Sequence, residues 1–171
     1  GDYNNLFAKH PSAAVGGVQF GFGSTARTTT YATVSAWSLA TGQDKRSLEQ
    51  DPLLADPGNG DYHPMSPGGR YRVGTGWVTA DTVSSPLIDA GNPQSLAWTA
   101  EQDPNGRRLN IGLYGGTPQA SKTPPDGFVI VIYPNTGARV SGVVTMQWAA
   151  VGSATNYSGR IEYSPDDFVA I

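Results

Sequence analysis

Apolar positions in this chain come in short runs, and turn residues separate the runs. Three stretches show the pattern: SLEQDPLLADPGNGDYHPM, SSPLIDAG and RRLNIGLYGG. Short, regularly spaced runs that end in Gly, Pro or Asp are typical of an all-β fold. The pieces PLIDAG and LNIGLYGG look like strand-plus-corner units, as in a solenoid whose coils stack their apolar faces. A further short strand is predicted at residues 3–8.

One helix is predicted, over residues 33–41. Thr33 is suited to cap its first turn, and Gly42 stands where a left-handed residue commonly ends a helix. The inward face is expected to carry Val34, Trp37 and Leu39 or Ala40. The first part of the chain is therefore predicted to be all-β with one short helix.

The pattern changes at a polar, proline-rich stretch, residues 117–127, and residues 123–127 are interpreted as a linker. Beyond it, residues 128–133 are a β-rich apolar run, and VVTMQW and GRIEYS alternate apolar with polar positions. Such alternation is typical of a two-sheet sandwich, and it places Trp148 in the sandwich core. A complete sandwich takes about 100 residues, so residues 128–171 are predicted to be a truncated one.

The amino-acid composition excludes several classes of function and site. Only 15% of the 171 residues are charged and the net charge is −3, so no basic patch is available for nucleic acid. The chain has no cysteine, which excludes disulfides and thiolate metal sites. No apolar run approaches the ~20 residues that span a bilayer, so no membrane span is expected. Because the chain begins and stops inside a pattern, we expect a fragment that is monomeric within a longer chain.

Four segments, in their order, carry a resemblance: DYNNLFA, YATVSAWSLATGQDKRSLEQDPLLADPGNGDYHPM, SSPLIDAGNP and PNGRRLNIGLYGGTPQASK. Residues 1–122 resemble the C-terminal coils and cap of secreted bacterial right-handed parallel β-helix proteins of the pectin-lyase-like superfamily. From residue 128, with IEYSPDDF, the chain is similar to the opening of an immunoglobulin-like or fibronectin-like module. The resemblance implies a secreted or cell-surface protein whose partner is extracellular polysaccharide. The chain departs from the pattern at residues 63–65, where relatives carry a leucine-containing strand, so a strand at 61–65 is left open.

Asp51, Asp56 and Asp61 recur every five residues, and they are candidate calcium ligands or members of a glycosidase carboxylate pair. The calcium-loop template needs oxygen ligands at its third and fifth positions. Counted from Asp56, those positions hold Gly58 and Gly60. Asp-Pro and Asn-Gly neighbours favour turns. Structural turns are therefore preferred, with an irregular calcium site as the alternative, and no other cofactor is expected.

Asp89 ends the apolar run of SSPLIDAG, and it is either a buried catalytic acid or an acceptor in a turn. Gly91 can take a positive φ at no steric cost, and an Asp two residues before it can accept a backbone N–H of the corner. We prefer the turn. Arg107 and Arg108 follow a strong turn sequence, and a surface arginine paired with a nearby Asp is preferred to the base or charge clamp that an arginine supplies in acidic-polysaccharide lyases. His63 is interpreted as a packed or solvent-facing ring.

Tyr71, Trp77 and Trp98 are candidate carbohydrate-binding residues, because exposed rings can stack on sugars; a cap over the apolar end of the solenoid is the favoured alternative. No set of acid, base and nucleophile is recognisable, so no catalytic residue is predicted. The prediction is a non-catalytic structural or attachment segment. The alternative is the C-terminal part of a polysaccharide lyase or glycoside hydrolase whose active site lies upstream.

Overall fold

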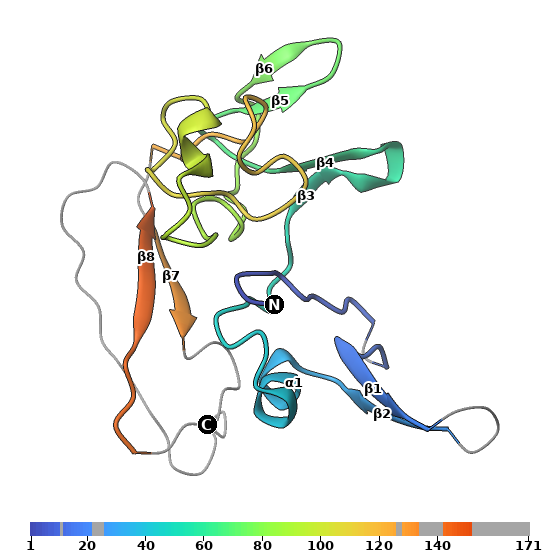
Figure 1. Ribbon diagram of the computed structural model, residues 1–171. Helices are drawn as coiled ribbons and strands as arrows, with labels where there is room; N and C mark the ends of the chain where they lie inside the picture. The colour runs from blue at the N-terminus through green and yellow to red at the C-terminus, as the bar shows by residue number, and fades with distance from the viewer. Residues whose placement is uncertain (11, 22–25, 126–127, 134–141, 152–171) are drawn as a thin grey trace, which may run out of the picture.

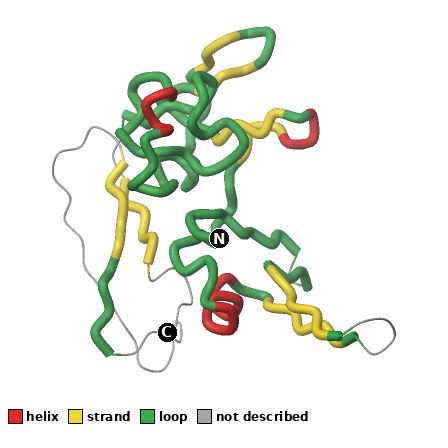
Figure 2. Tube along the Cα trace, in the orientation of Figure 1, coloured by secondary structure: helices red, strands yellow, loops and turns green. Residues whose placement is uncertain are grey.

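The computed structural model describes residues 1–10, 12–21, 26–125, 128–133 and 142–151 (Figure 1). This part of the chain contains four two-stranded antiparallel sheets and one short α-helix, joined by long loops (Figure 2). The elements are β1 Gly16–Phe20, β2 Arg27–Tyr31, α1 Val34–Thr41, β3 Leu54–Asp56, the 3₁₀ turn η2 Pro57–Asn59, β4 Asp61–Pro64, β5 Arg70–Arg72, β6 Gly76–Val78, the 3₁₀ turn η3 Ala97–Ala100, β7 Phe128–Tyr133 and β8 Gln147–Val151. The expectation of a β-rich chain with one short helix is confirmed at this level.

The helix α1 has the caps that its sequence predicts. Thr33 Oγ1 accepts the N–H of Ala36 at 3.1 Å. Gly42 ends the helix with a φ of 74°, a conformation that glycine adopts without a steric penalty. Local signals of this kind lie within a few residues of each other, and they are enough to fix where this helix begins and ends.

The inward face of α1 is smaller than predicted. Val34 is fully buried, whereas Leu39 is 78% exposed and Ala40 is also exposed, so that part of the prediction is wrong. The reason is that α1 packs on the β1–β2 hairpin through Trp37. Its ring lies edge-on to Tyr31 with the ring centroids 5.7 Å apart.

The buried residues of the apolar core cluster lie outside the helices and strands. Its buried members and the partly buried side chains packed on them are Leu48, Leu87, Ile88 and Ala90, with Tyr3, Leu54 and Ile111. Burying a side chain the size of Leu or Ile stabilises a fold by about 2 kcal/mol. Loops from distant parts of the sequence therefore meet at this small apolar cluster, and its burial holds them together.

A parallel contact joins the start of the chain to this core. Asn5 forms an isolated parallel bridge with Leu48. Leu48 donates its N–H to Asn4 O at 2.7 Å, and its carbonyl accepts the N–H of Leu6 at 2.9 Å. The strand predicted at residues 3–8 is thus reduced to this one bridge.

Residues 61–64 do form a strand, β4, which pairs with β3. The strand that the sequence left open at residues 61–65 is therefore present over residues 61–64.

Part of the segment that the sequence assigns to a linker is packed against the described part of residues 1–122, which we call the main unit. Thr123 and Pro124 are buried. The N–H of Thr123 donates to Pro104 O at 2.8 Å, and the preceding Lys122 donates its N–H to Gly69 O at 2.8 Å. Only Pro125, in the described part of residues 123–127, is exposed.

The strands β7 and β8 pair with each other, and β7 matches the apolar run predicted at residues 128–133. β8 begins at Gln147. Trp148 is 58% exposed, so its assignment to a sandwich core is wrong for the structure described. The strand predicted in GRIEYS, residues 159–164, lies outside the described residues, as does most of the predicted sandwich at 128–171.

Candidate functional site

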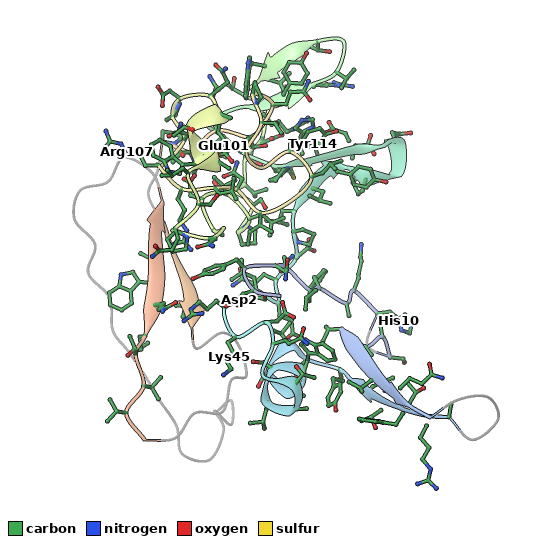
Figure 3. All side chains as sticks on the ribbon, viewed as in Figure 1. Asp2, His10, Lys45, Glu101, Arg107 and Tyr114 are labelled. Carbon is green, nitrogen blue, oxygen red and sulfur yellow. The ribbon has the colours of Figure 1, made fainter. Side chains whose placement is uncertain are left out.

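An aromatic row crosses the two hairpins β3–β4 and β5–β6. We use this name for Trp77, Tyr71, His63 and Tyr114. Tyr71 and Trp77 are direct cross-strand partners on β5 and β6, and their rings meet edge to face with centroids 6.0 Å apart. The row continues to His63 at 6.2 Å from Tyr71, and His63 stacks on Tyr114 at 3.6 Å. Figure 3 shows Tyr114 beside β4.

The exposed end of the row is Trp77, which is 37% exposed. The Lys122 ammonium lies 4.5 Å from the centroid of its ring. A cation over an indole face is attracted by the ring quadrupole, so this contact orients the indole and keeps a positive charge at the surface.

Charged groups lie under the row and are paired. Asp61 Oδ1 contacts His63 Nδ1 at 2.7 Å, and its Oδ2 accepts a hydrogen bond from Arg70 Nη1 at 2.8 Å. Arg70 Nε also donates to Asp81 at 2.9 Å. Although burial opposes its ionisation, the hydrogen bonds from His63 and the charge of Arg70 hold the pKa of Asp61 below its ordinary value. Asp61 is therefore a structural anion whose two oxygens are engaged.

A cavity of about 450 Å³ opens beside these groups. Its walls come from β3, η2, β4, β5 and the loop that carries Tyr114, and the lining residues that carry polar side chains are Asp56, Asn59, Asp61, His63, Arg70, Arg72 and Tyr114. Arg72 is exposed at the cavity. The cavity thus holds hydrogen-bond donors and acceptors next to aromatic rings, an arrangement that suits a polyhydroxylated ligand. The chemistry available is binding by hydrogen bonds and stacking.

His63 has one nitrogen without a partner among the described residues. Its Nε2 is buried and makes no hydrogen bond there, while the whole residue is 1% exposed. The interpretation as a packed ring is confirmed. Because the stacked Tyr114 and the surrounding chain cover the ring, Nε2 cannot reach a bound ligand in this arrangement.

The structure brings together two of the three aromatic residues singled out in the sequence. Trp98 lies in η3 and has no ring contact with the aromatic row among the described contacts. Its carbonyl accepts a hydrogen bond from Asn105 Nδ2 at 3.4 Å. No sequence signal indicates the two residues that complete the row, His63 and Tyr114, since their stacking joins positions 51 residues apart.

The three candidate calcium ligands act in local contacts. Asp51 Oδ1 accepts the N–H of Leu53 at 3.0 Å, and Asp56 Oδ2 accepts from Asn59 Nδ2 at 2.8 Å. Asp61 is engaged as described above. In the described ranges, no three side chains of His, Cys, Asp or Glu gather as they would around a metal ion. These contacts agree with the turn interpretation, and the irregular calcium site stays the untested alternative.

Asp89 lies in a buried corner, and the structure corrects how that corner is built. Asp89 itself has the positive φ, 53°, while Gly91 does not belong to the residues with positive φ. Gly91 is needed for space instead, because a Cβ there would come within 2.7 Å of Leu109 O. Asp89 Oδ2 accepts from Thr123 Oγ1 at 2.7 Å, and no backbone N–H of the corner is its donor in the described contacts.

A second buried carboxylate, which the sequence analysis missed, shares a partner with Asp89. Asn110 Oδ1 accepts the N–H of Asp89 at 2.7 Å, and the N–H of Asn110 donates to Glu101 Oε1 at 3.0 Å. Glu101 Oε1 also accepts from Gly116 N at 2.8 Å. One oxygen of each carboxylate, Oδ1 and Oε2, has no partner among the described residues.

Burial dominates the ionisation of both carboxyls. It raises the pKa of Asp89 to about 7, with the nearby Glu101 adding to the rise and Thr123 and Arg108 opposing it. Burial likewise raises the pKa of Glu101, against its two backbone hydrogen bonds. Asp89 is 1% exposed and does not line the cavity beside the aromatic row. A perturbed carboxyl that no ligand can touch is a structural group, which supports the turn over the catalytic acid.

Arg108 does not form the ion pair that the sequence favoured. Its Nε donates to Gly91 O at 2.8 Å and its Nη2 donates to Ala90 O at 3.3 Å. No carboxylate among the described residues lies within ion-pairing distance of it. The guanidinium instead closes the corner that follows Asp89. Arg107 and His10 lie elsewhere on the surface, where Figure 3 labels them.

No helix in the described ranges is long and apolar enough to cross a membrane.

Comparisons with protein-family profiles, curated proteins and solved structures found no significant match to the chain.

Proposed function

We propose that this chain is the C-terminal part of an extracellular right-handed parallel β-helix protein, joined to the start of an immunoglobulin-like module, and that it attaches the parent protein to polysaccharide. The observation that carries the proposal is the aromatic row, whose exposed end is Trp77 and whose other end, His63 and Tyr114, lines a polar cavity of about 450 Å³. The row offers ring faces, and the cavity offers the guanidinium, amide and hydroxyl groups that recognise sugar hydroxyls.

The stacked-coil architecture has its own support. The parallel bridge between Asn5 and Leu48 is the contact expected between neighbouring coils. Further backbone bonds step between corner segments, from Ile111 N to Leu87 O at 2.8 Å and from Gly91 N to Leu109 O at 2.7 Å. In a stacked solenoid these amides exchange slowly with solvent, because they open only when coils separate. Fast exchange at Leu48 and Ile111 would count against the architecture.

Attachment is tested by affinity electrophoresis of the chain in gels that contain pectate, alginate or a neutral glucan. We expect retardation by at least one of them. Trp77→Ala should weaken it at least about tenfold, which corresponds to about 1.4 kcal/mol and is ordinary for truncating a central Trp.

The matched control is Trp98→Ala, which removes the same side chain outside the aromatic row. It should keep the wild-type retardation. Equal loss in both variants, or no retardation by any of the glycans, would remove the support for attachment through this surface.

The enzymatic alternative, the end of a polysaccharide lyase or glycoside hydrolase, is favoured by one observation, the contact of 2.7 Å between Asp61 and His63. A carboxylate that fixes an imidazole is a common part of acid–base catalysis. Since Nε2 of His63 is covered, we expect no product from the same glycans. Turnover that His63→Gln abolishes would establish the alternative.

A further inference from the structure

A second cavity, of about 610 Å³, lies where the main unit meets β8, away from the aromatic row. Its lining residues come from the start of the chain, three loops and the segment that leads into β8, and the polar side chains among them are Tyr3, Arg46, Asn92, Gln94, Arg108 and Gln147. It shares no residue with the cavity of the proposed attachment surface. No carboxylate side chain lines it, whereas two guanidinium groups do.

Arg108 is the more unusual of the two. It is half-buried, and its described hydrogen bonds go only to the carbonyls of Ala90 and Gly91. Burial lowers its pKa, against the influence of Tyr3 and Asp89. A buried charge normally has a counter-ion, because removing it from water is costly unless it is paired. Asp89, the carboxyl whose charge acts on Arg108, has a pKa raised to about 7 by burial and is therefore mostly protonated below that pH.

Arg46 is held in place at the same cavity. Its Nη1 donates to Asp2 at 2.9 Å and its Nε donates to Gln147 at 3.0 Å. Its Cζ lies 6.0 Å from the centroid of the Tyr3 ring. Both guanidinium groups are thus fixed by the protein before any ligand arrives, which lowers the entropic cost of binding one.

We infer that this junction cavity is a binding site for a small organic carboxylate, with Arg108 as the counter-charge and the exposed Asn92 and Gln94 as further hydrogen-bonding groups. A guanidinium matches a carboxylate in geometry and forms charge-assisted hydrogen bonds with it. The described contacts leave Nη1 of Arg108 without an acceptor, and the carboxylate takes that place.

The experiment uses glucuronate as the probe and glucose as its neutral counterpart, because the two differ only at C6, where a carboxylate replaces a hydroxymethyl group. Titration of the full chain is followed by the arginine side-chain N–H signals in NMR spectra and by calorimetry. We expect glucuronate to bind at least tenfold more tightly than glucose and to shift the Nε signal of Arg108. Equal affinity for the two sugars would overturn the inference.

Gln94→Glu places a carboxylate in the cavity without touching the hydrogen bonds of Arg108. The side chain of Gln94 is exposed, and only its backbone N–H takes part in a described bond, to Asn92. We expect at least fivefold weaker glucuronate binding. Gln102→Glu, at an exposed position that does not line the cavity, makes the same charge change and should leave binding intact.

Two outcomes separate this site from the attachment surface. Trp77→Ala should leave glucuronate binding unchanged, so the inference survives a failure of the proposed function. If Gln102→Glu weakens binding as much as Gln94→Glu, the effect is general electrostatics and the site is refuted.

Discussion

Asn110 accepts the backbone N–H of Asp89 with its side-chain oxygen at 2.7 Å, across 21 residues of sequence. The same amide donates from Nδ2 to Ser121 O at 2.7 Å. One buried side chain thus joins the corner at Asp89 to the segment that ends the main unit.

Asn110→Ala should be strongly destabilising. It leaves the N–H of Asp89 and the carbonyl of Ser121 unpaired in the interior, at about 1–3 kcal/mol for each buried group. Denaturant unfolding measures the loss. Asn92→Ala is the control, since Asn92 is exposed and its bond to Gln94 N can be replaced by water. If the two variants lose similar free energies of unfolding, the buried contacts of Asn110 stabilise the fold no more than the exposed bond of Asn92 does.

The free energy of unfolding should fall as the pH rises from about 4 to 7. The pKa of Asp89 is raised to about 7 from a usual value of 3.8, so the folded chain binds the proton more tightly than the unfolded chain within this window. Stability therefore decreases toward the higher pH, by up to about 4 kcal/mol if the shift is fully expressed. Glu101, whose pKa is also raised, acts in the same direction. Denaturant melts at several pH values test this, and stability that rises across the window would contradict it.

Asp89→Asn and Asp89→Ala should differ in how much they lower the free energy of unfolding. Asn keeps an oxygen that can accept from Thr123, so at pH 5 it should cost about 1 kcal/mol or less, whereas Ala strands the buried hydroxyl at about 1–3 kcal/mol. Asn should also flatten the pH dependence, because it removes the titrating group. Equal losses at pH 5, measured by denaturant melts, would refute the acceptor role of Asp89.

Gly91→Ala should destabilise the chain by about 1–3 kcal/mol, because its new methyl group would lie only 2.7 Å from Leu109 O. Gly58→Ala is the matched control, since a Cβ there has only one neighbour, Asp56 Oδ1 at 3.8 Å. Thermal unfolding of both variants compares them. An unchanged melting temperature in Gly91→Ala would show that the corner can move apart to accept the methyl group.

Chelation with EDTA should leave the melting temperature unchanged. The carboxylates of Asp51, Asp56 and Asp61 already accept hydrogen bonds within the chain. A calcium-dependent rise in melting temperature, lost in Asp56→Asn, would establish the irregular calcium site instead.

The elements that the sequence predicts correctly depend on neighbours along the chain. The bounds of α1 follow from Thr33 and Gly42, which lie next to it, and β7 follows from an unbroken apolar run. Leu39 was wrongly predicted to face inward. The β1–β2 hairpin contacts α1 through Trp37, and helical periodicity alone does not show which side of a helix a hairpin will cover.

The candidate site was predicted only in part, for a related reason. Tyr71 and Trp77 face each other across one hairpin, which a short sequence separation makes foreseeable. Tyr114 reaches His63 from another loop, and Thr123 reaches Asp89 across 34 residues. The positive φ at Asp89, where Gly91 was expected to take it, is likewise set by those distant partners.

The packing of residues 121–124 also has a mechanical consequence. Ser121 Oγ donates to Pro64 O at 2.6 Å, Lys122 donates to Gly69 O, and Thr123 is fastened to Pro104 and Asp89. A pulling force applied to the chain beyond Pro125 is therefore borne first by several bonds that lead into different loops of the main unit. Because such bonds must break together, this anchor resists tension better than a free connector would, and through the Thr123 side chain part of the load passes to the buried corner at Asp89.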